Sequence, residues 1–368
     1  MRVAFVLPGL HRVNRGAEIA FEAIAQELSQ YQDVDVTLFG SGQPREGSLY
    51  HFEHVDNIPR ERFEQNWPKL PIFRTDYVYE ELTYVGNLLS TYRATAFDAT
   101  VTCSYPFINW FLRWRGGRKR PAHVFVTQNS DHPAITNQSE YRFFACEGLV
   151  CTNLEYFERN QARWRSALIT NGVEPSRFYP SPVDRTQFGL PPNAPIALMV
   201  SALIPSKRIT EGIKAAAKIN NLHLVICGDG PERDVVCALG QALMGDRFHH
   251  KKLPYEKMPD IYRAADVFMH FSLDEPFGNI YLEALATGLP IVSHDRDVTR
   301  WIVEENAVLV DSTQTPAIVQ GINQALAQRD KAAIAARLEL IQRRFTWKAI
   351  GQQYYEFLKQ IVSKRDRD

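Results

Sequence analysis

Two glutamates, Glu275 and Glu283, stand eight residues apart in the segment DEPFGNIYLEALATGLPIV (274–292). The proline–glycine turn between them and the apolar spacing that follows predict a helix beginning near Asn279, with Glu283 in its second turn. Backbone amides at a helix start bind phosphate groups, and a carboxylate accepts hydrogen bonds from hydroxyl groups. The segment therefore predicts a site for a ligand that carries phosphate groups as well as hydroxyl groups. The amides concerned are those of Gly278, Asn279 and Ile280.

A second candidate lies in LPGLHRVNRGAEIAFEAIAQEL (7–28), where an apolar strand leads through a glycine-containing loop into a predicted helix. Gly16, at the helix start, permits a ligand to approach closely, and Arg12 and Arg15 add positive charge. The loop does not have the G-x-G-x-x-G spacing of a dinucleotide-binding turn. It is therefore either a second anion site or a plain connection between a strand and a helix.

The strands and helices that must position these residues follow the same alternating pattern in two successive parts of the chain. Short apolar runs alternate with segments of helical period, first over residues 1–172 and again over 196–346. This alternation predicts an α/β protein with two doubly wound parallel sheets, each covered by helices on both faces. A proline-rich segment, 173–195, predicts a linker between them. We expect the last helical segment, 347–368, to pack back on the first domain.

Composition excludes several classes of protein. The 368 residues are 45% hydrophobic and 23% charged, as in a globular enzyme. Because 42 basic residues balance 42 acidic ones, we expect no nucleic-acid partner. Five cysteines without a C-x-x-C pair argue for a reducing compartment. The amino-terminal run MRVAFVLPGL reads as a strand rather than a signal peptide, and no apolar run is long enough to span a bilayer, so we expect a cytoplasmic protein.

The segment 274–292 resembles the E-x7-E signature of retaining glycosyltransferases of family 4, which have the GT-B fold of two Rossmann-like domains facing across a cleft. Other segments resemble motifs of the same family in the same order. They are ALITNGVEPSRFYP (167–180), VSALIPSKRITEGIKA (200–215), LHLVICGDGPERD (222–234) and YEKMPDIYRAADVFMHFS (255–272). The resemblance covers most of the chain and implies transfer of a sugar from a nucleotide-diphosphate donor to an acceptor.

The resemblance also implies a role for each matching residue. Glu283 would accept hydrogen bonds from the ribose, Glu275 would orient the transferred sugar, and Lys207 would stabilise the departing diphosphate. The donor would bind the domain 196–346, and the acceptor would bind the first domain. Further donor contacts are expected from Gly228, Leu253 and Pro254. Enzymes with this fold usually need no metal, so we expect no cofactor and treat Asp295-Arg296-Asp297 as a chance match to a D-x-D metal motif.

One departure from the family concerns the diphosphate site. The family's loop arginine falls on Ala202 here, so a second cation must come from elsewhere. Arg208 is the first candidate, followed by Arg15 or Arg12. Where the family usually has Gly-Gly after a later strand, this chain has Arg296, which is either part of the anion site or an ordinary surface residue.

The polar segment VTQNSDHP (126–133) follows a predicted buried strand, where family members often carry a histidine that faces the acceptor. That position is Gln128 here. Asp131 is a catalytic candidate to steer an acceptor hydroxyl, and His132 could relay its proton, while a loop cap is the structural alternative for Asp131. The weakly patterned stretch 40–73 predicts a loop-rich insertion facing the acceptor. The acceptor-side candidates are Gln128, Asn129, His132 and Arg15.

The segment YPFINWFLRWRGGRKRP (105–121) combines aromatic side chains with a basic run. Such a combination suits contact with the anionic inner face of a membrane. Its first half is also where a core helix of the first domain belongs. Burial of the aromatic side chains and peripheral membrane contact both remain open.

Two other functions remain open beside a glycosyltransferase. A GT-B sugar-nucleotide epimerase would need acid–base groups, for which Asp131 and His132 are candidates. A non-catalytic sugar-nucleotide-binding protein would be consistent with the missing loop arginine, although Glu275, Glu283 and Lys207 argue against it. The acceptor could be a glycan, a glycolipid or a small molecule.

Overall fold

The predicted alternation of strands and helices forms two α/β units in the computed structural model, which describes residues 1–63, 72, 73 and 75–365. The first domain comprises Met1–Asn171 together with the segment that begins at Trp347, and the second domain comprises Gly172–Thr346. Residues 64–71, which belong to the predicted insertion, lie outside the described residues, as does residue 74. The same holds for the last residues of the final predicted helix, 366–368.

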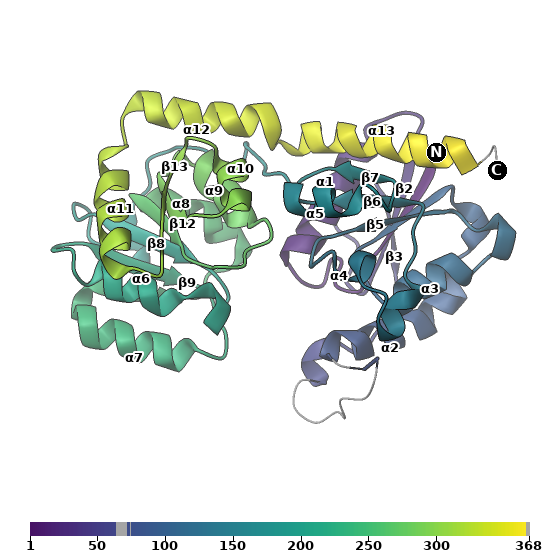
Figure 1. The fold of residues 1–368 in the computed structure, drawn as a ribbon, viewed down its shortest axis with the longest axis horizontal. Coiled ribbons are helices and arrows are strands. Elements are labelled where there is room, and N and C mark those ends of the chain that lie inside the picture. The colour runs from purple at the N-terminus through teal and green to yellow at the C-terminus, as the bar shows by residue number, and fades with distance from the viewer. Residues whose placement is uncertain (64–71, 74, 366–368) are drawn as a thin grey trace. The chain divides into compact units, whose positions relative to one another are not determined.

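The described strands of the first domain form one parallel sheet in the order β3-β2-β1-β4-β5-β6-β7 (Figure 1). The strands are β1 Arg2–Val6, β2 Asp35–Gly40, β3 His51–His54, β4 Ala99–Thr102, β5 Ala122–Val126, β6 Gly148–Cys151 and β7 Ser166–Leu168. The helices are α1 Gly16–Leu28, α2 Asp76–Thr91, α3 Phe107–Trp114, α4 His132–Ile135, α5 Leu154–Asn160 and α13 Trp347–Arg365.

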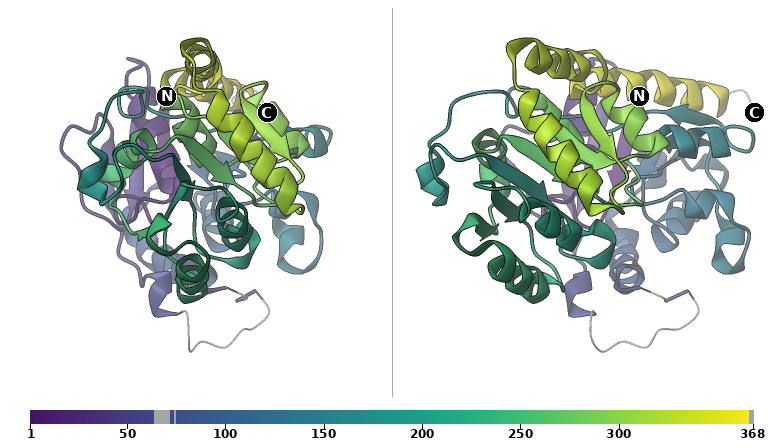
Figure 2. Two further views of the ribbon diagram at one scale, coloured as in Figure 1. Left: turned by 90° about the vertical axis from the view of Figure 1, so that its left-hand side faces the viewer. Right: turned by 60° about the vertical axis from the view of Figure 1, so that its left-hand side comes forward.

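Strand β1 shows why the first domain has apolar residues at successive strand positions. Val3 and Phe5 pack in one apolar cluster with residues of α1 and α13, whereas Ala4 and Val6 pack in another with residues of α2 and α3. These two pairs of helices cover opposite faces of the sheet (Figures 1 and 2). A parallel sheet buried on both faces requires apolar side chains in both directions, as the sequence predicted.

Helix α13 completes the first domain from the far end of the chain. It packs along α1, where a Cβ at Gly351 would lie only 2.5 Å from the Cβ of Glu27, so the two helices meet closely. The rings of Tyr31 and Tyr355 stack with centroids 4.1 Å apart, and the Tyr355 hydroxyl donates to the carboxylate of Asp33.

The described strands of the second domain form another parallel sheet, in the order β10-β9-β8-β11-β12-β13. The strands are β8 Ile196–Val200, β9 His223–Cys227, β10 Phe248–Lys251, β11 Val267–His270, β12 Ile291–His294 and β13 Ala307–Val310. The helices are α6 Ile209–Ala216, α7 Arg233–Met244, α8 Met258–Ala264, α9 Asn279–Ala286, α10 Asp297–Val303, α11 Thr315–Ala327 and α12 Lys331–Arg344. Two parallel-sheet Rossmann-like domains are thereby confirmed.

The strand order of each sheet reverses direction at one point, between β1 and β4 in the first domain and between β8 and β11 in the second. In open parallel sheets the crevice at the carboxyl ends of two such strands is where ligands bind, because the loops leave toward opposite faces there. The loops after β8 and β11 hold Lys207 and Glu275, respectively.

The sequence predicted that the proline-rich segment 173–195 is a linker between the domains. In the structure this segment is part of the second domain. Phe178, Phe188 and Leu190 are buried in its core. Arg185 also donates to the buried carboxylate of Asp266 at 2.8 Å. Proline excludes a regular element here, yet the apolar residues between the prolines anchor the segment along the domain.

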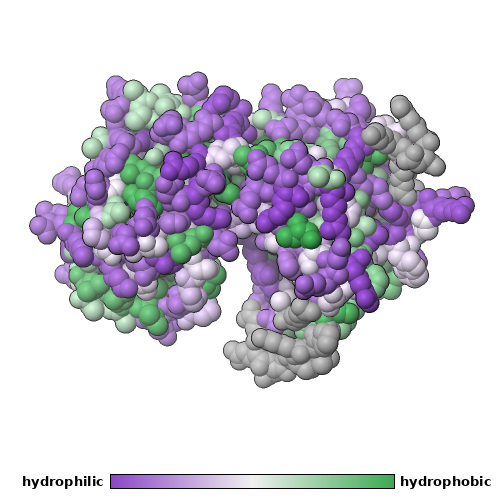
Figure 3. All heavy atoms as spheres, in the orientation of Figure 1, coloured by the Kyte–Doolittle hydropathy of each residue, from purple (hydrophilic) through white to green (hydrophobic). Residues whose placement is uncertain are grey.

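The surface of each domain on the face drawn in Figure 3 is mostly hydrophilic, with scattered hydrophobic residues. Among the described residues, no helix is both long and apolar enough to cross a bilayer.

Candidate functional site

The turn Glu275–Gly278 leads from β11 into α9, as the sequence predicted. Gly278 is the N-cap residue of α9 and has a φ of +73°, a backbone conformation that glycine adopts without strain. A Cβ there would lie 3.0 Å from the Tyr281 ring. Glycine has no side chain to accept from the first amides of the helix, which include those of Asn279 and Ile280. This helix start has the form of an anion site.

Glu275 is held by two donors that converge on one of its oxygens. Lys207 Nζ lies 2.6 Å and His270 Nε2 3.0 Å from Glu275 Oε2, and all three side chains are largely buried. Burial alone would raise the pKa of Glu275, but the hydrogen bond and charge of His270 and the charge of Lys207 lower it to about 2. Glu275 is therefore a carboxylate at any physiological pH.

His270 is itself fixed by its neighbours at the end of β11. Its carbonyl accepts a hydrogen bond from Ser293 Oγ at 2.9 Å, and Ser293 is bonded to the Tyr281 hydroxyl at 2.8 Å. The Tyr281 ring packs edge-on against the imidazole at 5.4 Å between centroids. The orientation of His270 toward Glu275 is thus determined by β12 and α9 together.

Glu283 lies in the second turn of α9, five residues after the glycine N-cap. Burial raises its pKa to about 7, although the positive charge of Arg177 acts in the opposite direction. Arg177 in turn lies over the Tyr255 ring, with its guanidinium carbon 3.6 Å from the centroid, and donates to the Tyr255 carbonyl. Arg177 and Tyr255 therefore belong to the surroundings of Glu283.

The loop after β8 packs against the turn after β9. Gly228 has a φ of +153°, and a Cβ there would lie 1.8 Å from the Ser201 carbonyl oxygen, so only glycine fits. The Leu203 amide also donates to the Asp229 carbonyl at 3.0 Å. Leu253, in the loop after β10, packs against the domain core, and Pro254 follows it.

The three arginines proposed as the second cation all have protein partners. Arg208 donates to the carbonyl of Ser312, after the edge strand β13, at 3.0 Å. Its positive charge also acts on His294, at the end of β12.

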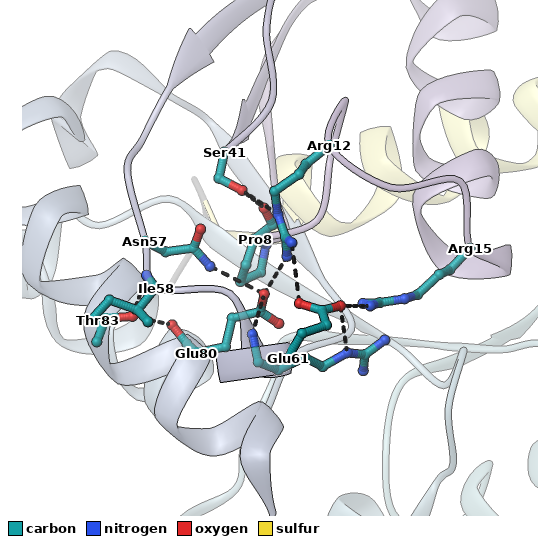
Figure 4. Close-up of polar contacts among 10 residues, drawn as sticks. Pro8, Arg12, Arg15, Ser41, Asn57, Ile58, Glu61, Glu80 and Thr83 are labelled. Carbon is teal, nitrogen blue, oxygen red and sulfur yellow. Dashed lines mark hydrogen bonds and ion pairs between the residues drawn. The ribbon is translucent and has the colours of Figure 1, made fainter. Parts of the chain in front are cut away.

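Arg12 and Arg15 lie in the first domain, near the carboxyl end of β1 (Figure 4). Arg12 pairs with the buried Glu80 and donates to Ser41 Oγ at 3.0 Å, while Arg15 pairs with Glu61. These pairs hold the loop before α1, whose first residue is Gly16.

Three of the acceptor-side candidates, Gln128, Asn129 and His132, follow strand β5, whereas Arg15 lies just before α1. Gln128 and Asn171 exchange two side-chain hydrogen bonds, at 2.6 and 3.0 Å. Asn129 is exposed, and His132 packs edge-on against Tyr141. None of these contacts joins the four candidates into one constellation among the described residues.

Asp131 does not have the position expected of a catalytic group. Its carboxylate is buried and accepts from Arg159 Nε and Nη2, each at 2.9 Å, and from Asn160 Nδ2 at 2.8 Å. It does not cap the following helix α4 either. The carboxylate joins α5 to the loop after β5, which is a structural role.

His270, Arg177 and Tyr255 are site residues that the sequence analysis did not single out. His270 ends the buried strand VFMH, five residues before Glu275, and a histidine at that place in an apolar run is a signal that could have identified it. Nothing in the spacing of Arg177 indicates that it approaches Glu283. Among the described residues, no group of three or more His, Cys, Asp or Glu side chains could hold a metal ion.

Several known proteins are similar to this chain in sequence or in fold. Residues 181–338 match the family model described as glycosyl transferases group 1. The chain is a glycosyltransferase. It is 28% identical over 241 residues to the lipopolysaccharide core biosynthesis glycosyltransferase LpsE of Rhizobium meliloti, an alignment that covers 63% of this chain and 69% of LpsE. An alpha-maltose-1-phosphate synthase of Mycolicibacterium smegmatis is 26% identical over 222 residues, 54% of this chain and 57% of that protein.

Solved structures resemble the glycosyltransferase over its whole length. A sucrose-phosphate synthase from Thermosynechococcus elongatus superimposes with a TM-score of 0.80 at 20% identity, covering 99% of both chains. Anabaena HepE in complex with UDP and glucose superimposes with a TM-score of 0.73 at 20% identity, covering 97% of this chain and 99% of HepE. At this identity the likeness shows the fold, which is GT-B, as predicted.

Proposed function

We propose that this glycosyltransferase moves a sugar from a nucleotide-diphosphate donor to a hydroxyl acceptor with retention of anomeric configuration. The observation that supports this most is the pairing of Lys207 with Glu275 beside the start of α9, at the point where the strand order reverses. That arrangement combines a cation and helix amides for a diphosphate with a permanently ionised carboxylate for sugar hydroxyls. The E-x7-E resemblance to family 4 adds the expectation of retention.

The bond changes define what the protein must stabilise. The bond between the anomeric carbon and the β-phosphate oxygen breaks, and its electron pair passes to that oxygen. A new bond forms from the anomeric carbon to the acceptor oxygen, on the same face of the sugar. The acceptor's proton passes to the departing diphosphate. Negative charge therefore grows on the diphosphate, where Lys207 and the amides of α9 would stabilise it.

The two glutamates would then serve different parts of the donor. Glu275, ionised throughout, would accept hydrogen bonds from the transferred sugar and orient it. Glu283, further along α9, would accept from the neighbouring ribose hydroxyls. No strong catalytic base is required, because the leaving phosphate takes the proton.

The relatives suggest which substrates to test first. HepE was solved with UDP and glucose, and LpsE is named for lipopolysaccharide core biosynthesis. We therefore propose a nucleotide sugar as donor and a glycan or glycolipid as acceptor, with no metal. The epimerase alternative named Asp131 and His132 as acid–base groups, and the ion pair of Asp131 with Arg159 removes support from the first of them.

The first test is ligand binding by thermal shift with UDP, GDP, ADP, dTDP and their common sugar conjugates, with and without magnesium. We expect one nucleotide diphosphate to raise the unfolding temperature without metal. The conjugate that binds is then offered with a glycan acceptor, and the anomeric proton coupling of the product is read by NMR. A product of inverted configuration would contradict retention, and the absence of binding to every nucleotide would contradict the donor assignment.

We also propose a peripheral membrane contact through the end of α3. Packing accounts for Ile108, Phe111 and Leu112, which are buried, but the Trp114 side chain is 75% exposed. Phe143 is also exposed and lies against Trp110, one helical turn before Trp114. The neighbouring exposed cations are Arg115, Arg118, Lys119 and Arg142.

Exposed aromatic rings flanked by cations fit an anionic lipid surface, such as the inner face of a cytoplasmic membrane. The measurement is co-sedimentation with vesicles of phosphatidylglycerol and phosphatidylcholine. We expect binding that increases with the anionic fraction and is lost in Trp114→Ser together with Phe143→Ser. The proposal would be contradicted if neutral vesicles sedimented as much protein as anionic ones, or if the two substitutions had no effect on co-sedimentation.

A further inference from the structure

Tyr262, on α8, is a buried residue whose hydroxyl group lacks a well-formed hydrogen bond. Its side chain is fully buried, and among the described residues no partner lies in ordinary hydrogen-bond geometry around the hydroxyl oxygen. A hydroxyl that is removed from water without such a partner destabilises the folded state, so these groups are rare in native proteins. The proposed function gives this hydroxyl no role.

The ring of Tyr262 is fixed in the core of the second domain. Phe178, from the proline-rich segment, packs edge-on against it with centroids 5.9 Å apart, and the ring of Phe268, on β11, lies at 5.7 Å. Helix α8 itself packs against α9. The hydroxyl can therefore be satisfied only by a group close to its present position.

Glu283, in the second turn of α9, is the carboxylate beside this hydroxyl. Burial raises the pKa of Glu283, the Tyr262 hydroxyl is the first of the groups that lower it, and the resulting pKa is about 7. Burial also raises the pKa of Tyr262, and the charge of Glu283 and hydrogen bonding to it raise that pKa further. These are the effects of a phenol that donates toward a carboxylate. Because the contact lacks full hydrogen-bond geometry, the two groups are within reach of each other but not firmly bonded.

The surroundings of this pair contain few other titratable groups that act on it. Arg177, whose guanidinium lies over the Tyr255 ring, also lowers the pKa of Glu283. Cys227 and Tyr255 act on Tyr262. Burial raises the pKa of the Cys227 thiol to about 12, so of Cys227 and Glu283 only Glu283 ionises near neutral pH. Glu283 is also not fully buried, so its carboxylate can meet a ligand as well as Tyr262.

We propose that Tyr262 positions Glu283 for the ribose of the donor, by donating a hydrogen bond to its carboxylate when the nucleotide is bound. This inference rests on the proposed function, in which Glu283 accepts hydrogen bonds from the ribose hydroxyls. A carboxylate accepts several hydrogen bonds through its two oxygens, so one bond from Tyr262 leaves acceptors for the ribose. Ionisation of Glu283 strengthens both contacts, because a charged acceptor binds a donor more tightly than a neutral one.

The experiment measures UDP binding by isothermal titration calorimetry on the full chain, from about pH 6 to about pH 9. GDP replaces UDP if it binds more tightly. Tyr262→Phe removes only the hydroxyl group, and we expect it to raise the Kd for UDP at neutral pH about tenfold. The rise of affinity with pH should also move to higher pH than in the wild type, because Glu283 loses a donor that lowers its pKa. Ionisation of UDP itself affects both proteins alike.

Tyr84→Phe is the matched control. Tyr84, on α2 of the first domain, is also fully buried, and within the described part of the chain its hydroxyl likewise has no well-formed hydrogen bond. This variant should leave the Kd for UDP and its pH dependence unchanged. In neither variant should the unfolding temperature of the ligand-free protein fall, because neither hydroxyl is firmly bonded there.

The outcomes separate the inference from the function on which it rests. A Tyr262→Phe protein that binds UDP like the wild type at every pH would overturn the inference. A Kd raised by the same factor at every pH would also overturn it, because the hydroxyl would then not act through Glu283. Failure of Tyr262→Phe to fold would assign the hydroxyl a structural role instead. A wild-type protein that binds neither UDP nor GDP would overturn the proposed function itself and the inference with it.

Discussion

Lys207 donates to Oε2 of Glu275 from 2.6 Å, so a cation proposed to bind the diphosphate is paired in the structure with a carboxylate proposed to bind the sugar. The pair neutralises two charges that would otherwise be unpaired in a largely buried place. A bound diphosphate would compete with Glu275 for Lys207. The charge of the ligand would then replace that of the carboxylate without leaving the ammonium unpaired.

Lys207→Ala should lower turnover by about two to three orders of magnitude, because the diphosphate would depart without a fixed cation. Steady-state rates with the identified donor measure this. Lys214→Ala is the control, since Lys214 forms an exposed ion pair with Glu211 on α6. Near-normal turnover of Lys207→Ala would transfer the role to another cation.

His270→Phe should reduce kcat by about tenfold to a hundredfold, with a smaller change in the KM for the donor, because Glu275 would lose the donor that orients it. His270→Gln is the matched variant, since its amide can donate from near the position of Nε2. We expect it to recover part of the activity. Equal loss in both variants would mean that the shape of the imidazole matters rather than its hydrogen bond.

Because the pKa of Glu283 is raised, we expect the affinity for the nucleotide to depend on pH. This pKa is about 7, and the ionised carboxylate is the better acceptor for ribose hydroxyls, so binding should strengthen as the pH rises from about 6 to about 8. Calorimetry at several pH values, with Glu283→Gln as reference, separates this from ionisation of the ligand. If the affinity of the wild type and that of Glu283→Gln depended on pH in the same way, Glu283 would not belong to the nucleotide site.

The same pKa predicts how stability changes with pH. The folded protein retains the proton of Glu283 up to about pH 7, whereas the unfolded chain loses it near the ordinary value of 4.5. The folded state therefore binds more protons between these values, and this contribution to stability falls as the pH rises. Denaturant unfolding of the wild type should show a decline with pH across that window that Glu283→Gln lacks.

Asp131→Ala tests the structural role of a residue that the sequence presented as catalytic. Removing the buried carboxylate leaves Arg159 and Asn160 without their acceptor, and we expect a loss of about 1–3 kcal/mol in the free energy of unfolding. Activity per folded molecule should stay near that of the wild type. A large fall in kcat with unchanged stability would restore the catalytic assignment.

The fold was predictable because most strands are apolar at successive positions, a pattern that a parallel sheet buried on both faces requires. Strand β3, with the sequence HFEH, lies at the sheet edge and is largely exposed, so it has no such pattern. The segment 173–195 was misjudged for a related reason. Its prolines exclude regular structure, but they do not prevent Phe178 and Phe188 from entering the core.

The candidate site was predictable where the chemistry is local in sequence, as in Glu275, Gly278 and Glu283. It was not predictable where the function of a side chain depends on a distant partner. The Asp131 carboxylate accepts hydrogen bonds from Arg159, 28 residues away, and Arg296 donates to the carbonyl of Glu275, 21 residues away. Spacing along the chain carries no information about which way such side chains turn.

Helix α13 makes the order of synthesis matter for this protein. The second domain is one continuous stretch, Gly172–Thr346, whereas the first draws part of its core from residues 347–365. During synthesis the whole of the second domain leaves the ribosome before α13 does. The face of β1 that carries Val3 and Phe5 is therefore not fully covered until then. The domain that is made first is thus the one that is completed last.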